Sequence, residues 1–202
     1  MTVTIFDLGL GNMHSVHRAI ERVAGEARVT RDPADLDRAT GLGGPGQGAY
    51  RDGDRAIQGA AGDALRAYLA SGRPYLGICL GMQLLFETSE EAPDEAGLAH
   101  FSGFVKRFSG HATEGGRRLK VPNMGWSPVT SAHPLLDDGG YYYFVHSYHC
   151  VPDDPDLVVA SAPFDVPFAA AVAKDNVFAC QFHPEKSQRR GAALLERFLA
   201  WS

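Results

Sequence analysis

The amino-acid sequence predicts an α/β fold with a mostly parallel central sheet, helices on both of its faces, and added antiparallel strands. The first half of the chain alternates short apolar strands with segments of helical periodicity, an order typical of parallel sheets. From Gly103 onward, short aromatic and β-branched runs are interrupted by Gly and Pro, which favours antiparallel strands. With 202 residues, 45% of them hydrophobic, a single domain over residues 1–202 is expected.

The elements of the first half follow in order. Val3–Phe6 has the composition of a short buried strand, and the turn Asp7–Asn12 opens a helix. The apolar residues of that helix keep the spacing of one helical face: Val16, Ala19, Ile20 and Val23. A second helix is expected over 60–71, then a strand over 74–78 and a helix over 80–88.

In the second half, strands are expected within 103–108, 141–148 and 157–161. Phe168–Ala173 and Val177–Phe182 flank three polar residues, a pattern that predicts a β-hairpin. A final helix carries four apolar residues at helical spacing: Leu194, Leu195, Phe198 and Leu199.

Composition excludes several functional classes. The net charge of -5 arises from 24 acidic and 19 basic side chains that are interspersed, so nucleic acid is not expected as a partner. No apolar run is long enough to cross a bilayer and no signal-peptide pattern is present, so a cytoplasmic protein without a membrane partner is expected. The three cysteines have no Cys-x-x-Cys spacing, which argues against disulfides and a thiolate metal site, and no cofactor is expected.

One cysteine has the surroundings of a nucleophile. Gly77-Ile78-Cys79-Leu80-Gly81 has the Gly-x-nucleophile-x-Gly form between an apolar strand and an apolar-periodic helix. The glycines permit a sharp turn that exposes the thiol, and the following helix N-terminus favours the thiolate. The backbone N–H of Leu80 becomes available as an oxyanion donor. The alternative is that Cys79 is a small core residue.

A base and its orienting acid are predicted near the end of the chain. In Gln181–Ser187, His183 leaves a β-rich run and Pro184 ends the strand. His183 can take the thiol proton, and Glu185 can orient the imidazole and stabilise its charged form. By itself, the His-Pro-Glu run is also compatible with a solvated surface turn.

A glycine-rich loop is expected over 43–48. An N–H from Gly46 or Gln47 could face a developing oxyanion together with the N–H of Leu80. Glycine-rich loops are often simple turns, and this one lacks the Lys-Ser/Thr of a phosphate-binding loop.

Two histidines in a strand pattern do not indicate a metal site. His146 and His149 are expected to point to opposite faces of one strand, so they should not bind one ion. The aromatic run Tyr141–Phe144 is interpreted as sheet core and edge, because no basic patch accompanies it.

Three separated motifs resemble those of class I (triad-type) glutamine amidotransferases: Pro45–Gly48, Gly77–Gln83 and Phe182–Glu185. Further segments are similar to those of the glutaminase subunits of imidazole glycerol phosphate synthases: 9–16, Val121–Trp126, Tyr143–Tyr148 and Gln181–Ser187. The resemblance runs from residue 1 to about 200, in matching order.

This resemblance implies a flavodoxin-like class I glutamine amidotransferase domain that hydrolyses L-glutamine through a γ-glutamyl thioester on Cys79. It also implies that the ammonia passes to a separate (β/α)8-barrel cyclase subunit as the second chain of a heterodimer. That subunit uses the ammonia to make imidazole glycerol phosphate and AICAR in L-histidine biosynthesis. No cofactor is implied.

The resemblance also implies roles for individual residues. Cys79, His183 and Glu185 would form the triad. Candidates for holding the amino-acid end of glutamine are Gln83 and Glu91, with the backbone of Ser147 and Tyr148 for its carboxylate. Positions expected near the cyclase interface are Asn12, Trp126 and Lys186.

The chain departs from the family pattern at a few positions. Asn123 stands where similar proteins usually have His, Gly43-Gly44 replaces an apolar pair, and Gln47 replaces a more common Val. None of these changes touches the expected triad. Two other functions stay open: a glutaminase serving another biosynthetic pathway, and a non-catalytic scaffold or thiol-based redox sensor of similar fold.

Overall fold

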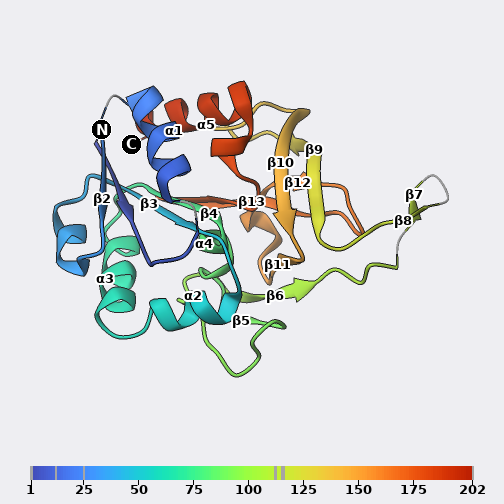
Figure 1. Ribbon diagram of the computed structural model, residues 1–202, viewed down its shortest axis with the longest axis horizontal. Coiled ribbons are helices and arrows are strands. Elements are labelled where there is room, and N and C mark those ends of the chain that lie inside the picture. The colour runs from blue at the N-terminus through green and yellow to red at the C-terminus, as the bar shows by residue number, and fades with distance from the viewer. Residues whose placement is uncertain (1, 12, 25, 112, 115–116, 202) are drawn as a thin grey trace.

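The computed structural model describes residues 2–11, 13–24, 26–111, 113–114 and 117–201 (Figure 1). In these ranges a nine-stranded sheet has the order β10-β9-β12-β13-β14-β4-β3-β1-β2. Its parallel strands are β2 (Ala27–Thr30), β1 (Val3–Phe6), β3 (Gly41–Gly46), β4 (Tyr75–Cys79) and β14 (Val177–Cys180). Its antiparallel extension consists of β13 (Phe168–Lys174), β12 (Val158–Ala162), β9 (Asn123–Ser131) and β10 (Gly140–His146).

Smaller sheets and the helices complete the described part of the fold. A three-stranded sheet joins β11 (Tyr148–Pro152), β6 (Gly103–Arg107) and β5 (Thr88–Ser89), and β7 (Thr113–Glu114) pairs antiparallel with β8 (Arg117–Arg118). The α-helices are α1 (Met13–Ala24), α2 (Tyr50–Ala56), α3 (Ala60–Leu69), α4 (Leu80–Gln83) and α5 (Gln188–Ala200). Short 3-10 helices are η1 (Pro33–Arg38), η2 (Pro155–Leu157) and η3 (Pro184–Lys186). None of the helices in the described ranges has the length and apolar character to span a membrane.

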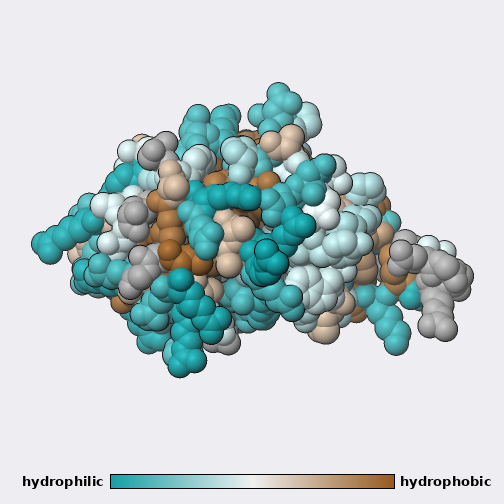
Figure 2. All heavy atoms as spheres, turned by 90° about the horizontal axis from the view of Figure 1, so that it is seen from above, coloured by the Kyte–Doolittle hydropathy of each residue, from teal (hydrophilic) through white to brown (hydrophobic). Residues whose placement is uncertain are grey.

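Helices cover both faces of the sheet, as predicted. Figure 1 shows α1 and α5 on one face and α2 and α3 on the other. Side chains of β14 alternate between the two faces: Val177 and Ala179 pack into the core under α2 and α3, whereas Phe178 and Cys180 pack under α1 and α5. The outer surface on the α1 and α5 side is mostly hydrophilic, with apolar side chains gathered in a narrow band (Figure 2). This pattern is that of amphipathic helices laid on a sheet.

The expected glycine-rich loop is largely a strand, so that expectation was wrong. Gly41–Gly46 forms the buried strand β3 between β1 and β4, with Gly44 paired to Gly77 and Gly46 to Cys79. The missing side chains are needed here, because a Cβ on Gly44 would overlap the ring and hydroxyl of Tyr75. Close packing against neighbouring strands therefore determines the conformation, and only the residues after Gly46 form a loop.

The helix expected over 80–88 ends at Gln83. The carbonyl of Leu84 accepts the N–H of Leu98 at 2.8 Å, and the carbonyl of Leu85 accepts that of His100 at 2.9 Å. These carbonyls bind a distant segment instead of continuing the helix, and the chain turns into β5. The helix is thus shortened by tertiary hydrogen bonds that local spacing does not reveal.

Candidate active site

Cys79 lies at the sharp junction between β4 and α4. It has φ of 54° and ψ of -106°, a strained conformation for a residue with a side chain. Its flanking glycines permit the turn: a Cβ on Gly77 would lie 2.8 Å from the Cβ of Ala179, and one on Gly81 would overlap the carbonyl oxygen of Gly44. This is the geometry of a nucleophile elbow.

Gly81→Ala is expected to lower the free energy of unfolding by about 3 kcal/mol or more, because the added methyl overlaps the backbone carbonyl of Gly44, which is held in the buried strand β3. For a chain of this size that is a fall in Tm of roughly 10 °C. Gly72→Ala is the matched control: its φ is +77°, but the space around it is open, so a cost of about 1–2 kcal/mol is expected. Equal Tm values for the two variants, measured by calorimetry, would contradict the packing argument.

The thiol opens into a pocket of about 330 Å³ although Cys79 itself is only 7% exposed. The exposed thiol expected at the turn is therefore correct only in part, because the pocket walls cover most of the side chain. A volume in this range is typical of small-molecule sites. The residues lining the pocket are Gln47, Gly48, Cys79, Leu80, Gln83, Glu91, Pro122, Val145, His146, Ser147, Tyr148 and His183.

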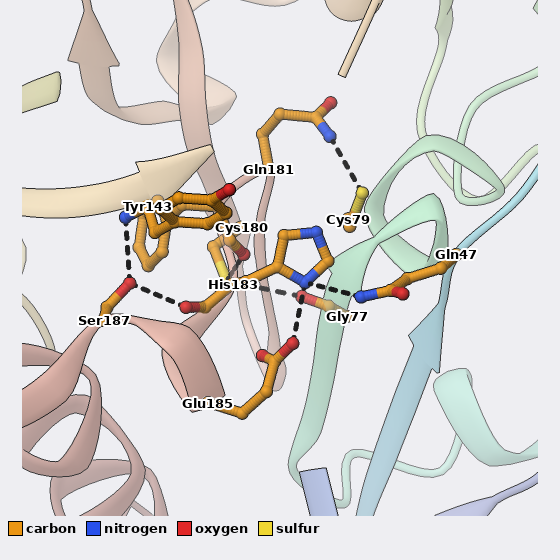
Figure 3. Close-up of polar contacts among 10 residues, drawn as sticks. Gln47, Gly77, Cys79, Tyr143, Cys180, Gln181, His183, Glu185 and Ser187 are labelled. Carbon is orange, nitrogen blue, oxygen red and sulfur yellow. Dashed lines mark hydrogen bonds and ion pairs between the residues drawn. The ribbon is translucent and has the colours of Figure 1, made fainter. Parts of the chain in front are cut away.

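His183 reaches the same pocket from the neighbouring strand. β14 runs parallel to β4, with Cys180 paired to Ile78, so the segments that follow the two strands leave the sheet at the same end. Nδ1 of His183 is 2.8 Å from Oε1 of Glu185, and both side chains are almost fully buried. Pro184 begins η3 between them and holds the two residues in one short turn. Figure 3 shows the carboxylate against one ring nitrogen, with the other nitrogen, Nε2, on the side of Cys79.

Backbone contacts fix the loop that carries the imidazole. The N–H of His183 donates to the carbonyl of Tyr143 at 2.9 Å. The hydroxyl of Ser187 donates to the carbonyl of His183 at 2.6 Å and accepts the N–H of Tyr143 at 3.0 Å. The base is therefore attached to β10 as well as to its own strand.

The pKa of His183 is raised from 6.5 to about 9. Burial lowers it, but the neighbouring Cys79 and the Glu185 carboxylate reverse that effect by favouring the imidazolium. Nε2 of His183 is buried and has no hydrogen-bond partner among the described residues. The sulfur of Cys79 instead accepts a hydrogen bond from Nε2 of Gln181 at 3.5 Å. The site thus places an unpartnered imidazole nitrogen at the pocket that the thiol lines.

The residues predicted to stabilise an oxyanion lie around the thiol. Leu80 and Gln47 line the pocket, whereas Gly46 lines a separate narrow space that Gln47 and Glu185 also border. The side-chain amide of Gln47 lies 3.3 Å (Nε2) from Nδ1 of His183. The segment after β3 therefore contacts the imidazole directly, which the sequence did not predict.

The four residues predicted to hold substrate also line the pocket. Nε2 of Gln83 donates to the carbonyl of Tyr148 at 3.3 Å and to Oε1 of Gln181 at 3.0 Å. Both of its N–H bonds are used within the protein, so its oxygen is the atom suited to accept from a ligand. Oε2 of Glu91 accepts the N–H of Tyr50 at 2.7 Å, which fixes a negative charge at the wall. Ser147 is the fourth residue of this group.

The expectation for His146 and His149 was wrong in its geometry. Their rings contact the same side chain, Phe108, at 5.4 Å and 4.6 Å between centroids. The predicted strand over 141–148 divides at Ser147 into β10 and β11, which belong to different sheets, so simple alternation does not apply. Burial lowers the pKa of His146 to about 3. Nδ1 of His146 donates to the carbonyl of Tyr148 at 2.7 Å, and Nε2 accepts from Asn123 at 3.3 Å, as expected for a neutral ring.

Of the residues predicted near a partner interface, Trp126 and Lys186 do not line the pocket. Trp126 and Lys186 both contact the Tyr143 ring: the Trp126 and Tyr143 ring centroids are 5.9 Å apart, and Nζ of Lys186 lies 6.0 Å from the Tyr143 centroid. Asn12 lies outside the described residues. Sequence reasoning missed Gln181 as a contact of the sulfur. Gln181 is a polar residue that directly follows the apolar strand β14, two positions before His183, and in an extended chain that spacing places two side chains on one face.

Comparisons with known proteins agree with this geometry. The family model for class-I glutamine amidotransferases matches residues 4–201. The imidazole glycerol phosphate synthase subunit HisH of Syntrophotalea carbinolica is 46% identical over 97% of this chain and 98% of that protein. The HisH of Chromobacterium violaceum is 44% identical over 100% and 98%. A crystal structure of a glutamine amidotransferase has the same fold, with a TM-score of 0.76, 21% identity, and 98% and 97% of the two chains covered. The chain therefore belongs to the class-I glutamine amidotransferase family.

Proposed function

We propose that this chain hydrolyses L-glutamine to L-glutamate and ammonia as the glutaminase subunit of an imidazole glycerol phosphate synthase, in L-histidine biosynthesis. The observation that carries the proposal is the convergence of a strained Cys79 and a buried His183–Glu185 pair on one pocket. The pathway is supported by relatives of that name, which match nearly the whole chain at 44–46% identity.

In the proposed mechanism, Nε2 of His183 takes the proton of the Cys79 thiol, and the thiolate attacks the side-chain amide carbon of glutamine. The N–H of Leu80, with one from Gly46 or Gln47, stabilises the tetrahedral oxyanion. His183 returns its proton to the nitrogen as ammonia leaves, and a γ-glutamyl thioester forms. His183 then takes a proton from water, which attacks the thioester and releases glutamate and the free thiol.

The pocket wall suits the amino-acid end of glutamine. Glu91 carries a negative charge that suits the substrate ammonium, and Gln83 offers an oxygen acceptor beside it. The backbone around Ser147 and Tyr148 is the proposed site for the substrate carboxylate. These groups select the free amino acid, since a glutamine within a peptide has neither charge.

The proposed partner surface, here called the β9–β10 face, consists of Met124, Trp126, Tyr141, Tyr143 and Lys186. Its Met124, Tyr141 and Trp126 are 64%, 57% and 44% exposed. Tyr143 is paired with Trp126 across the two strands, so these side chains share one side. Exposed aromatic and methionine side chains are enriched in protein interfaces. We infer that a (β/α)8-barrel cyclase subunit binds here, in a heterodimer, and takes the ammonia.

We also infer that residues 1–202 form one domain that works in the cytoplasm, without nucleic-acid or membrane partners. The single nine-stranded sheet joins both halves of the described chain. Cys150 and Cys180 are free and fully enclosed thiols.

The experiment is to measure glutamate release with and without the purified cyclase subunit, and to label Cys79 with a glutamine-analogue electrophile. The partner is expected to raise the rate. Trp126→Ala should weaken that increase while Cys79 labelling persists, because the β9–β10 face lies outside the pocket. The matched control is Val29→Ala, which truncates an exposed apolar side chain (41%) on the far edge strand and should respond normally to the partner.

Two outcomes would contradict the proposal. Labelling by simple alkylating agents without any preference for the glutamine shape would favour a thiol sensor. Activation by a different synthase, with none by the cyclase, would assign the chain to another pathway.

A further inference from the structure

A buried line of side-chain hydrogen bonds connects the sulfur of Cys79 to the wall of the pocket. Nε2 of Gln181 donates to Sγ of Cys79 at 3.5 Å (Figure 3). Oε1 of Gln181 accepts from Nε2 of Gln83 at 3.0 Å, and the same nitrogen of Gln83 donates to the carbonyl of Tyr148 at 3.3 Å. Gln181 is fully buried, and Gln83 is 6% exposed.

The direction of every bond in this line is fixed by one backbone group. The carbonyl of Tyr148 can only accept, so the nitrogen of the Gln83 amide must face it. That nitrogen also faces Gln181, which must therefore present its oxygen to Gln83. The remaining NH2 group of Gln181 is thereby directed at the sulfur. An N–H, and not a carbonyl oxygen, is held against the nucleophile.

We propose that Gln181 is a catalytic hydrogen-bond donor to Cys79, which stabilises the thiolate and couples it to the substrate-binding Gln83. The donor favours the charged sulfur over the thiol, because hydrogen bonds to an ionised acceptor are stronger. The proton that leaves the sulfur goes to Nε2 of His183, which has no other partner in the described part of the chain. This role rests on the proposed function, in which Cys79 attacks glutamine.

Coupling to substrate follows from the order of the bonds. When the oxygen of Gln83 accepts a hydrogen bond from the substrate ammonium, the N–H bonds of the same amide become more polarised. They then bind the oxygen of Gln181 more tightly, and Gln181 in turn becomes a better donor to the sulfur. An occupied pocket therefore favours the reactive form of Cys79.

The test replaces Gln181 by two residues of similar length that lack the N–H. Gln181→Glu keeps an acceptor for Gln83, and Gln181→Met has no donor and only the weak acceptor of a thioether. For each variant, the alkylation rate of Cys79 by iodoacetamide is measured against pH by mass spectrometry, and kcat and KM for glutamine are measured with the partner bound. Both variants are expected to show about tenfold slower alkylation at pH 7, a shift of the alkylation profile to higher pH, and a fall mainly in kcat.

The control is Asn176→Asp, which makes the same amide-to-acid change at the other end of β14. Asn176 donates to the carbonyls of Leu69 and Arg73 at 3.2 Å and 2.7 Å, so this variant loses stability without contacting the sulfur. A purely structural Gln181 would behave like this control, with a lower Tm and an unchanged alkylation profile. That result, or a wild-type profile for Gln181→Met, would overturn the donor role.

The outcome is separable from that of the proposed function. If the native protein neither releases glutamate nor reacts with the glutamine analogue, the glutaminase assignment fails. The alkylation profiles of the Gln181 variants would still decide whether its N–H stabilises the thiolate.

Discussion

Replacing Cys79 by serine is expected to lower partner-stimulated glutamate release by about 10⁴-fold or more, the scale of loss seen when a nucleophile is removed from a triad. A serine hydroxyl is a far weaker acid than a thiol, and neither His183 nor the helix N-terminus compensates for that difference. The measurement is glutamate produced at saturating glutamine, with circular dichroism to show that the variant is folded.

Cys150→Ala is the matched control for that experiment. Cys150 is a second buried thiol, and burial raises its pKa well above the ordinary value, so it stays protonated and unreactive. The control is expected to retain most of its turnover. Undiminished turnover in Cys79→Ser, or equal losses in the two variants, would remove Cys79 from the mechanism.

Replacing Glu185 by glutamine is expected to reduce turnover by roughly 10²–10⁴-fold, because a neutral amide does not stabilise the imidazolium and can turn its NH2 group to Nδ1 of His183, which favours the wrong tautomer. The pKa of His183 should fall from about 9, because burial lowers it and the Glu185 carboxylate, which raises it, is then absent. NMR titration of the ring measures this shift directly, and a retained pKa with full turnover would exclude Glu185 from the site.

The same substitution has a consequence for stability. A histidine whose pKa rises from 6.5 to about 9 on folding binds more protons in the native state. It therefore contributes stability that is fully present below pH 6.5 and is lost as the pH rises through 9. In Glu185→Gln the part of that pH dependence due to the carboxylate should disappear. Urea unfolding at pH 6 and pH 9 checks this, with Glu21→Gln, an exposed glutamate on α1, as the control.

The convergence of Cys79 and His183 could be predicted from sequence because each lies in a local motif at the end of a buried strand. Strand β3 could not be predicted, because its run of glycines has little strand propensity and only packing against Tyr75 and β4 makes it extended. The early end of α4 depends on hydrogen bonds to residues near 100, which local spacing does not contain.

Side-chain partners far apart in sequence were also beyond prediction. Gln181 belongs to a motif that resembles the family pattern, but its bond to Gln83 joins residues 98 positions apart. The contact between Gln47 and His183 spans 136 positions. Spacing along the chain identifies chemically suitable residues, whereas the identity of the atoms they touch depends on the packed fold.

The loop that carries the imidazole of His183 has an attachment that the sulfur of Cys79 lacks. The sulfur belongs to β4, which has parallel neighbours on both sides. The loop that carries the imidazole forms two hydrogen bonds to the backbone of Tyr143 on β10: the N–H of His183 donates to its carbonyl, and its N–H donates to the hydroxyl of Ser187. Tyr143 also lies on the exposed ribbon beside Trp126. We therefore expect a protein that binds this ribbon to act on the position of the His183 imidazole more than on that of the Cys79 sulfur. The distance between the Cys79 sulfur and the His183 imidazole is then the quantity through which binding at the ribbon would change the rate of glutamine hydrolysis.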